Sequence, residues 1–282
     1  MGMLKRIIVI SLSVLCVIGL TFYNATKVNT RQLKIREETV NSDKIDEDLD
    51  GFLIAFFSDV CYGSFINIDD LNRVVETVNA YKPDMIVFTG DLIDVTENDL
   101  TPEMIDELKA FLSSLDAYYG KFVVRGDHDR DCEAILQEIY SESGFTLLSN
   151  EKQIIGPDSD SYLVLTGIDP FVQDKQPYTD LLTDTVHYSI AAVHYPDTFA
   201  ELENYSFDLC LAGHSLGGQI YIPIVSMFRR DYGCQQYYRG KIIKNGGILD
   251  ITNGIGRRNT DARLWADAEV VFYTLKPAMS GE

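Results

Sequence analysis

Three apolar runs, each ending in acidic residues, decide the fold of this chain: GFLIAFFSDVC at 51–61, MIVFTGDLID at 85–94 and KFVVRGDHD at 121–129. Such short apolar runs, bounded by turn residues, are typical of buried strands. Between the first two runs, apolar residues recur at the spacing of one helix face, at Leu71, Val74, Val75 and Val78. Before the third run, Thr101 and Pro102 supply the capping hydroxyl and the first-position proline that begin a helix. This alternation of strands and helices predicts parallel βαβ units.

Beyond residue 140 the pattern changes to shorter strands separated by turns and short helices. We expect these strands at 145–148, 162–168, 187–194, 208–212, 248–252 and 269–275. The chain has 282 residues and 46% of them are apolar, so it can bury a large core. We therefore predict an α/β sandwich that occupies residues 51–277 as one domain.

Metal-ligating side chains follow five of the expected strands at the point where each strand ends. They are Asp59, Asp91, Asp127, His194 and His214. Taken singly, each is more often a turn residue or a buried structural histidine than a ligand. Loops at the carboxyl ends of strands in α/β sheets converge on the ligand site, however. Five such residues together predict a metal centre.

In these motifs and their order, the chain resembles the calcineurin-like metallophosphoesterases, and among them the membrane-anchored or exported bacterial phosphoesterases. The resemblance runs from about Gly51 to Leu275 and rests on SDVC at 58–61, GDLID at 90–94, GDHD at 126–129, His194 and GHSLGGQ at 213–219. It implies a four-layer αββα sandwich that holds two metal ions bridged by the aspartate of the second motif. It also implies hydrolysis of phosphate mono- or diesters by metal-activated water.

Carried over residue by residue, the resemblance implies metal ligands at Asp59, Cys61, Asp91, Asp127, His194 and His214. Asp59 would hold the first metal, Asp91 would bridge the two, and the histidines would hold the second. His128 would be catalytic, either neutralising charge on the phosphoryl oxygens or protonating the leaving group. Asp129 would also serve catalysis by orienting His128, and Asp94 would be an acid behind the ligands.

Three positions depart from the family pattern of Asp-x-His, Gly-Asp-x-x-Asp, Gly-Asn-His-Asp/Glu, a lone His and Gly-His-x-His. Cys61 replaces the first histidine, Asp127 the asparagine and Leu216 the last histidine. Leucine cannot ligate a metal, whereas Cys61 either ligates as a thiolate or fills space beside a vacant site. The second site keeps four ligands, with one more carboxylate than usual. We therefore expect one divalent metal, or a weakened pair, of Mn, Fe or Zn.

Two functions follow from this altered centre. The first is a metal-dependent phosphoric ester hydrolase of reduced activity, acting on a phosphate-ester small molecule or a lipid-related substrate. The second is a catalytically impaired relative that keeps the fold for a binding or regulatory role. A serine hydrolase is disfavoured, although GHSLG at 213–217 matches a nucleophile elbow, because none of the four histidines follows Ser215.

Residues 1–23 combine a short basic head with an uncharged apolar run from Ile7 to Tyr23. That run is short for a spanning helix and long for the core of a signal peptide. We predict a single-pass signal anchor, with a cleaved signal peptide as the alternative, followed by a tether at 24–50 that holds one strand near 31–36. Basic residues after the span favour a cytoplasmic body, whereas the family resemblance favours an extracytoplasmic one.

The charge of the chain is unevenly distributed. Six of the 24 basic residues lie in residues 1–36, and all 43 acidic residues lie beyond them. So acidic a body repels polyanions, and we expect no nucleic-acid binding. The five cysteines contain no Cys-x-x-Cys pair and imply no disulfide framework. We expect a monomer.

Overall fold

The computed structural model describes residues 2–157, 160–169, 171, 181–182, 185–225 and 230–278. Within them the chain forms two six-stranded mixed sheets with helices, which confirms the predicted α/β fold. The first sheet has the order β1 (Leu33–Ser42), β12 (Ala268–Pro277), β2 (Leu53–Phe57), β3 (Met85–Phe88), β4 (Gly120–Val123) and β5 (Phe145–Leu147). The second has the order β10 (Gly240–Lys244), β11 (Gly247–Ile251), β9 (Leu209–Ala212), β8 (Ser189–Val193), β7 (Leu163–Ile168) and β6 (Glu151–Ile155).

The centre of each sheet is parallel, which places the carboxyl ends of its strands at one edge. Strands β2, β3, β4 and β5 pair in parallel, and β12 runs antiparallel to β2. In the second sheet β7, β8, β9 and β11 pair in parallel, with antiparallel β6 and β10 at the two edges. The loops after β2, β3, β4, β8 and β9 are those that carry the predicted ligands.

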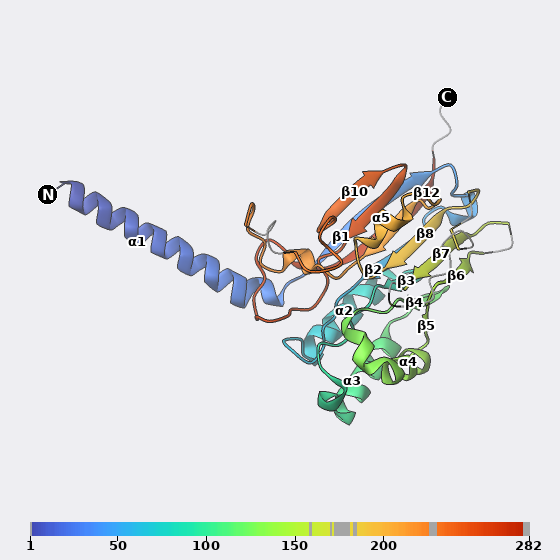
Figure 1. Ribbon diagram of the computed structural model, residues 1–282, viewed down its shortest axis with the longest axis horizontal. Coiled ribbons are helices and arrows are strands. Elements are labelled where there is room, and N and C mark those ends of the chain that lie inside the picture. Colours follow the sequence, from blue (N-terminus) through green and yellow to red (C-terminus); the bar gives the residue numbers. More distant parts are fainter. Residues whose placement is uncertain are drawn as a thin grey trace.

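Helices α2 (Ile68–Tyr81), α3 (Pro102–Ser114) and α4 (Glu133–Glu142) cover the outer face of the first sheet (Figure 1). Asn67 caps α2 in a reciprocal capping box with Asp70, and the Thr101 hydroxyl caps α3, as its sequence predicts. A short α5 (Thr198–Leu202) lies on the second sheet. The short helices within the described residues are a π-helix at Asn24–Val28 and 3-10 helices at Asn29–Arg31, Glu47–Leu49, Glu97–Asp99, His128–Cys132 and Leu216–Gly218.

Side-chain alternation along the strands builds three apolar layers. In β2, Ala55 and Phe57 face α2, α3 and α4, whereas Ile54 and Phe56 face the second sheet. In β9, Leu209 and Leu211 face the first sheet, whereas Cys210 and Ala212 pack with Phe199 and Leu202 of α5. Strands that are buried on both faces in this way are apolar throughout, which is why they could be predicted from the sequence.

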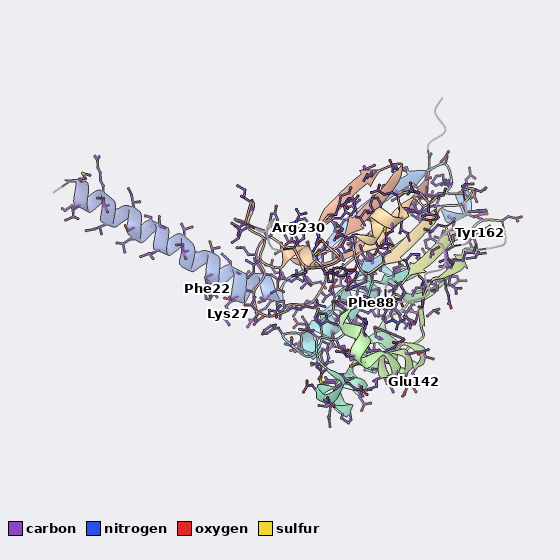
Figure 2. The ribbon with its side chains drawn as sticks, viewed as in Figure 1. Phe22, Lys27, Phe88, Glu142, Tyr162 and Arg230 are labelled. Atoms are coloured by element: carbon purple, nitrogen blue, oxygen red, sulfur yellow. The ribbon has the colours of Figure 1, made fainter. Side chains whose placement is uncertain are left out.

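Helix α1 (Gly2–Tyr23) extends away from the body with its apolar side chains exposed (Figure 1). The continuous helical stretch Gly2–Arg31 has a mean hydropathy of 2.2 in its most apolar window and is long enough to cross a membrane. Figure 2 shows Phe22 and Lys27 at the end of α1 that meets the body.

The segment expected as a tether is instead largely folded against the body. Strand β1 pairs with β12 along its whole length, from Leu33 with Ala268 to Ser42 with Pro277. The observed strand is therefore longer than the one predicted near 31–36, and it ends later in the chain. Ile45 and Leu49 are buried between the sheets. These two apolar residues are too isolated among charged neighbours to show a periodic pattern, which is why the sequence suggested a tether.

Candidate metal centre

The turns after the strands are sharp, and they bring the predicted ligands inward. Asp59 after β2, Asp91 after β3 and His214 after β9 all have positive φ angles, of 51°, 58° and 68°. Cys61 and Leu216 have φ angles of 51° as well. Side chains are disfavoured in this left-handed region, at a cost on the order of 1 kcal/mol each, and such strain clusters at functional sites.

Asp129 locks two of these turns together. One of its carboxylate oxygens accepts the backbone N–H groups of Asp91 and Gly126, and the other accepts that of Leu92, all at 2.9 Å. The loops are so close that a Cβ at Gly126 would overlap the Asp91 carboxylate, so glycine is required there. Asp129 was expected to orient His128, but its hydrogen bonds indicate a different role. It holds the backbone that carries Asp91 in place.

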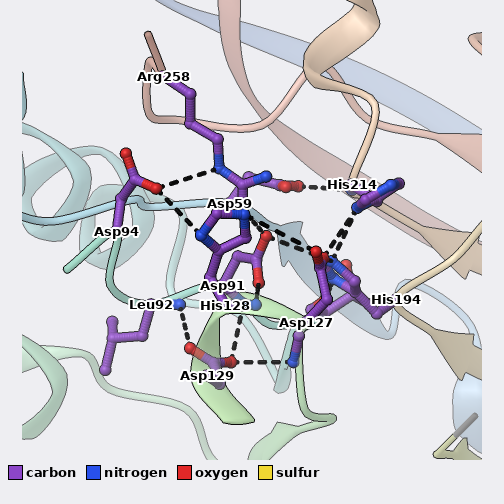
Figure 3. A network of polar contacts seen from close by, with 12 residues as sticks. Asp59, Asp91, Leu92, Asp94, Asp127, His128, Asp129, His194, His214 and Arg258 are labelled. Atoms are coloured by element: carbon purple, nitrogen blue, oxygen red, sulfur yellow. Dashed lines mark hydrogen bonds and ion pairs between the residues drawn. The ribbon is translucent and has the colours of Figure 1, made fainter. Parts of the chain in front are cut away.

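Four side chains from four different loops converge on one point (Figure 3). Their potential ligand atoms all lie within 4.8 Å of one another, in the four-residue cluster Asp91, Asp127, His194 and His214. His194 Nε2 lies 2.8 Å from Asp127 Oδ1 and 3.3 Å from Asp91 Oδ2. His214 Nδ1 lies 3.0 Å from Asp127 Oδ1. The structure thus brings together four of the six predicted metal ligands.

Backbone carbonyls select which ring nitrogen each histidine presents to the cluster. The Thr89 carbonyl lies 2.7 Å from His194 Nδ1, and the Tyr232 carbonyl lies 2.7 Å from His214 Nε2. A carbonyl can only accept, so the nitrogen facing it carries a proton. This leaves His194 Nε2 and His214 Nδ1 directed at the cluster, the arrangement in which metal-ligating histidines are usually held.

The electrostatics of the four-residue cluster favour a bound cation. Burial acts to lower the pKa of His194, but Asp91 and Asp127 outweigh it and raise that pKa well above its ordinary value. Burial acts to raise the pKa of Asp127, but the two histidines hold it well below its usual range. The carboxylates therefore stabilise positive charge at the point where the four side chains meet.

The donor set fits a divalent transition metal. Two carboxylates and two correctly presented imidazole nitrogens suit manganese, iron or zinc. Beside the cluster, Asp59 is fully buried, and its Oδ2 accepts the backbone N–H of His214 at 2.9 Å. Its Oδ1 accepts no hydrogen bond from the residues that the structure describes. A buried carboxylate oxygen with this vacancy is also consistent with a cation nearby.

His128 lies at the rim of the centre, with its side chain 38% exposed. Its Nδ1 is 3.1 Å from Asp94 Oδ1, and its Nε2 is 3.7 Å from Asp127 Oδ2. The contact with Asp94 raises the pKa of His128 despite its partial burial. Asp94 is thus the residue that orients His128, and it keeps the imidazole charged more readily at neutral pH.

The residues expected around the first metal are all buried, but they offer few ligand atoms. Burial raises the pKa of the Cys61 thiol well above its ordinary value, and nearby aspartates add to the effect. A protonated thiol is a weak ligand. Leu216 is 5% exposed and contributes only methyl groups. Asp59 is therefore the strongest remaining donor on this side.

Arg258 belongs to this centre, and Arg263 holds the turn that leads to it. Arg258 forms an ion pair with Asp91. Arg263 is fully buried, and its guanidinium donates to the carbonyls of Asn253, Gly254, Gly256 and Ala266. Arg125, which precedes the GDHD motif, pairs with Asp169 and Glu133. The sequence alone does not show which arginine pairs with Asp91, which supports a turn and which pairs with acidic residues outside the four-residue cluster.

Ser215 is not built as a nucleophile. Its Oγ accepts the backbone N–H of Gly217 at 3.2 Å and so closes the turn that follows His214. Among the described residues, no histidine is hydrogen-bonded to this hydroxyl. The geometry agrees with the sequence in disfavouring a serine hydrolase.

Two packed mixed sheets, with carboxylates and imidazoles gathered at converging strand ends, define a metal-binding α/β protein. A model of the calcineurin-like phosphoesterase family matches residues 52–218, more than half of the sequence. The chain belongs to the calcineurin-like phosphoesterase family.

The chain is similar along most of its length to other proteins of this kind. It is 30% identical over 257 residues to the uncharacterised metallophosphoesterase YkuE of Bacillus subtilis, covering 89% of this chain and 88% of that protein. It is 24% identical to a transmembrane protein with a metallophosphoesterase domain from Danio rerio, covering 87% of this chain but only 58% of that protein. The purple acid phosphatase PPD1 from yellow lupin seeds aligns with a TM-score of 0.42 and 11% identity, over 79% of this chain and 54% of that one.

Proposed function

We propose that this protein is a metal-dependent phosphoesterase that hydrolyses phosphate mono- or diesters at a centre with one principal divalent ion. The observation that carries the proposal is the four-residue cluster of Asp91, Asp127, His194 and His214, with its ligand atoms within 4.8 Å of one another. Family membership supports the reaction class. The candidates for the metal are manganese, iron and zinc.

The residues of the chain divide the work of such a reaction. A divalent ion, when bound, polarises a phosphoryl oxygen and lowers the pKa of a water molecule. Asp91 and Asp127 supply the negative charge that retains the ion. His128, whose pKa is raised by its contact with Asp94, is placed to donate to a phosphoryl or leaving oxygen. The side chains of Asp127 and His128 are 24% and 38% exposed, so substrate reaches the centre on their side.

Removing the metal should abolish turnover reversibly. We expect full-length protein, purified in detergent and stripped with a chelator, to lose at least about 99% of its hydrolysis of bis(p-nitrophenyl) phosphate. Mn²⁺ or Zn²⁺ added in excess should restore it. Hydrolysis that survives chelation would contradict the proposal. Metal binding without turnover on any phosphate ester would favour the alternative, a family member with a binding or regulatory role.

We further propose that α1 spans the membrane once and that the substrate is a phosphate ester at the membrane surface. A set of exposed apolar side chains near the base of α1 supports this. We call it the apolar rim: Ile220, Ile222, Ile224, Val225 and Trp265. Ile224 is 74% exposed and Trp265 is 59% exposed. Clustered apolar side chains on a surface commonly mark membrane or protein contacts.

Hydrogen bonds connect the segments of the apolar rim to each other and to the π-helix that continues α1. The backbone N–H of Tyr221 donates to the Leu264 carbonyl at 2.8 Å, and that of Arg263 donates to the Ala25 carbonyl at 2.9 Å. Tyr232 is 78% exposed, and its carbonyl lies 2.7 Å from His214 Nε2. A membrane crossed by α1 would thus lie near the loop that positions a metal ligand. We propose that the body lies on the extracytoplasmic side, which the family resemblance favours.

A charged apolar rim should impair turnover of a lipid substrate selectively. In the full-length Ile224→Asp/Val225→Asp variant, we expect phosphate release from phosphatidic acid in phosphatidylcholine vesicles to fall at least about tenfold, since apolar burial worth more than 1.4 kcal/mol is lost. Hydrolysis of soluble bis(p-nitrophenyl) phosphate should stay within about twofold. Ile154→Asp, at an exposed position on the opposite edge strand β6, is the matched control. Equal losses on both substrates, or none, would contradict a membrane substrate.

A further inference from the structure

Arg258 shares a carboxylate oxygen with the four-residue cluster. Its Nη2 donates to Asp91 Oδ2, the same oxygen that lies 3.3 Å from His194 Nε2. Its Nε lies 3.7 Å from Asp94 Oδ1, and its side chain is only 13% exposed. Figure 3 shows the guanidinium pointing into the carboxylates of the centre. A positive charge is therefore already held at Asp91 before any metal is considered.

The position of Arg258 is fixed by its backbone as well as by its side chain. The Arg258 N–H donates to Gln219 Oε1 at 2.8 Å, and Gln219 Nε2 donates to the Arg258 carbonyl at 2.9 Å. Gln219 directly follows the turn that carries His214 and Leu216. This two-point clamp ties the guanidinium to the loop of a cluster histidine, so Arg258 is part of a built site and not a loose surface residue.

The chain leading to Arg258 passes directly over the residues expected around a first metal. A Cβ placed on Gly254 would lie 2.8 Å from the Asp59 Cβ and 3.1 Å from Leu216 Cδ2. One placed on Gly256 would lie 2.6 Å from the Cys61 Cβ. The guanidinium thus reaches Asp91 from the side lined by Asp59, Cys61 and Leu216.

The chemistry of that lining suits a guanidinium better than a metal ion. A divalent transition metal needs several donor atoms around it, and a leucine and a buried thiol supply few. A guanidinium brings its own charge and needs only acceptors for its N–H groups, which Asp91 and its neighbours provide. Arg258 therefore accounts for how the two altered ligand positions can be tolerated beside a buried Asp91.

We propose that the guanidinium of Arg258 takes the place of a second metal ion at this centre. It neutralises Asp91 from the side lined by Asp59, Cys61 and Leu216, opposes a second divalent ion by like-charge repulsion, and leaves a single ion at the four-residue cluster. This inference rests on the proposed function in one respect, that the four-residue cluster binds a metal.

The test counts Mn²⁺ ions in the full-length protein in detergent, by elemental analysis and by electron paramagnetic resonance. Wild type should bind one tightly held Mn²⁺ with the signal of an isolated ion. In Arg258→Ala, a second Mn²⁺ should bind at least about a hundredfold more tightly than to wild type, because the like charge is gone. With Cys61→His and Leu216→His added, two ions should bind and give an exchange-coupled signal. Arg130→Ala, which removes a nearby charge that packs on Phe171, should leave the count at one.

The wild-type measurement decides the inference even if a variant fails to fold. Two tightly bound, exchange-coupled ions in wild type would overturn the role of Arg258 and leave the proposed phosphoesterase function standing. No bound metal in wild type would overturn both. An unchanged single ion in folded Arg258→Ala, with no gain in affinity for a second, would also contradict the inference.

Discussion

Replacing Asp91 with asparagine is expected to lower kcat by about a thousandfold, which corresponds to about 4 kcal/mol of transition-state stabilisation. Asparagine has the same shape, and its oxygen can still accept the backbone N–H of His128, which Asp91 Oδ1 accepts at 2.9 Å. The charge at Oδ2 is lost, however, and with it the attraction for the ion, for Arg258 and for His194. Steady-state kinetics at saturating Mn²⁺, with metal content measured in parallel, would check this.

Asp94→Asn is the matched control for that variant. It makes the same chemical change three residues further along, at a carboxylate that contacts His128 and Arg258 but lies outside the four-residue cluster. We expect it to retain its metal and to lose only about tenfold in kcat, because it acts through His128. If Asp91→Asn kept more than a tenth of wild-type turnover, Asp91 would not be a ligand of the catalytic ion.

Replacing Arg263 with alanine should cost about 3–5 kcal/mol of unfolding free energy. Arg263 is fully buried and satisfies the carbonyls of the 253–256 turn together with that of Ala266. Its loss leaves several buried acceptors without donors and opens a cavity, and both effects destabilise. For a domain of this size the midpoint temperature should fall by roughly 10 °C, as thermal unfolding followed by circular dichroism would measure.

Arg263→Lys should recover part of that loss, because an ammonium can reach some of the same carbonyls. Arg73→Ala is the control: Arg73 is partly exposed and pairs with Asp70 on the surface of α2, so its loss should cost less than about 1 kcal/mol. A midpoint for Arg263→Ala within 2 °C of wild type would show that the guanidinium is not needed to hold the turn. Activity should fall with stability, since the turn leads into Arg258.

The parts of the fold that the sequence predicted well are those buried on both faces. Strands β2, β3 and β4 are short apolar runs between turn signals, α2 and α3 show a helical period, and Thr101 marks the start of α3. Strands β6 and β10 were not predicted, because they are edge strands with mostly exposed side chains and weak alternation. The extent of β1 depends on its pairing with β12, more than 230 positions away, which no local pattern reveals.

In the metal centre, too, the residues marked by a local pattern could be predicted, and those placed by long-range contacts could not. Asp91, Asp127, His194 and His214 could be predicted as neighbours because each follows a strand, and parallel strands deliver such residues to one edge. Arg258 could not, because its place depends on the clamp by Gln219 and on the path of the glycine turn over Asp59 and Cys61. The importance of Asp129 could be predicted, but its role could not. A motif specifies side chains and does not show which backbone N–H groups a carboxylate will accept.

The most direct test of this account is the anomalous scattering of crystals of the full-length protein grown with Mn²⁺ or Zn²⁺. We expect one strong peak, within about 2.0–2.3 Å of ligand atoms from Asp91, Asp127, His194 and His214, with the Arg258 guanidinium still on Asp91. Two peaks of similar height about 3.5–4 Å apart, the second held by Asp59 and Cys61, would contradict a centre with one metal ion.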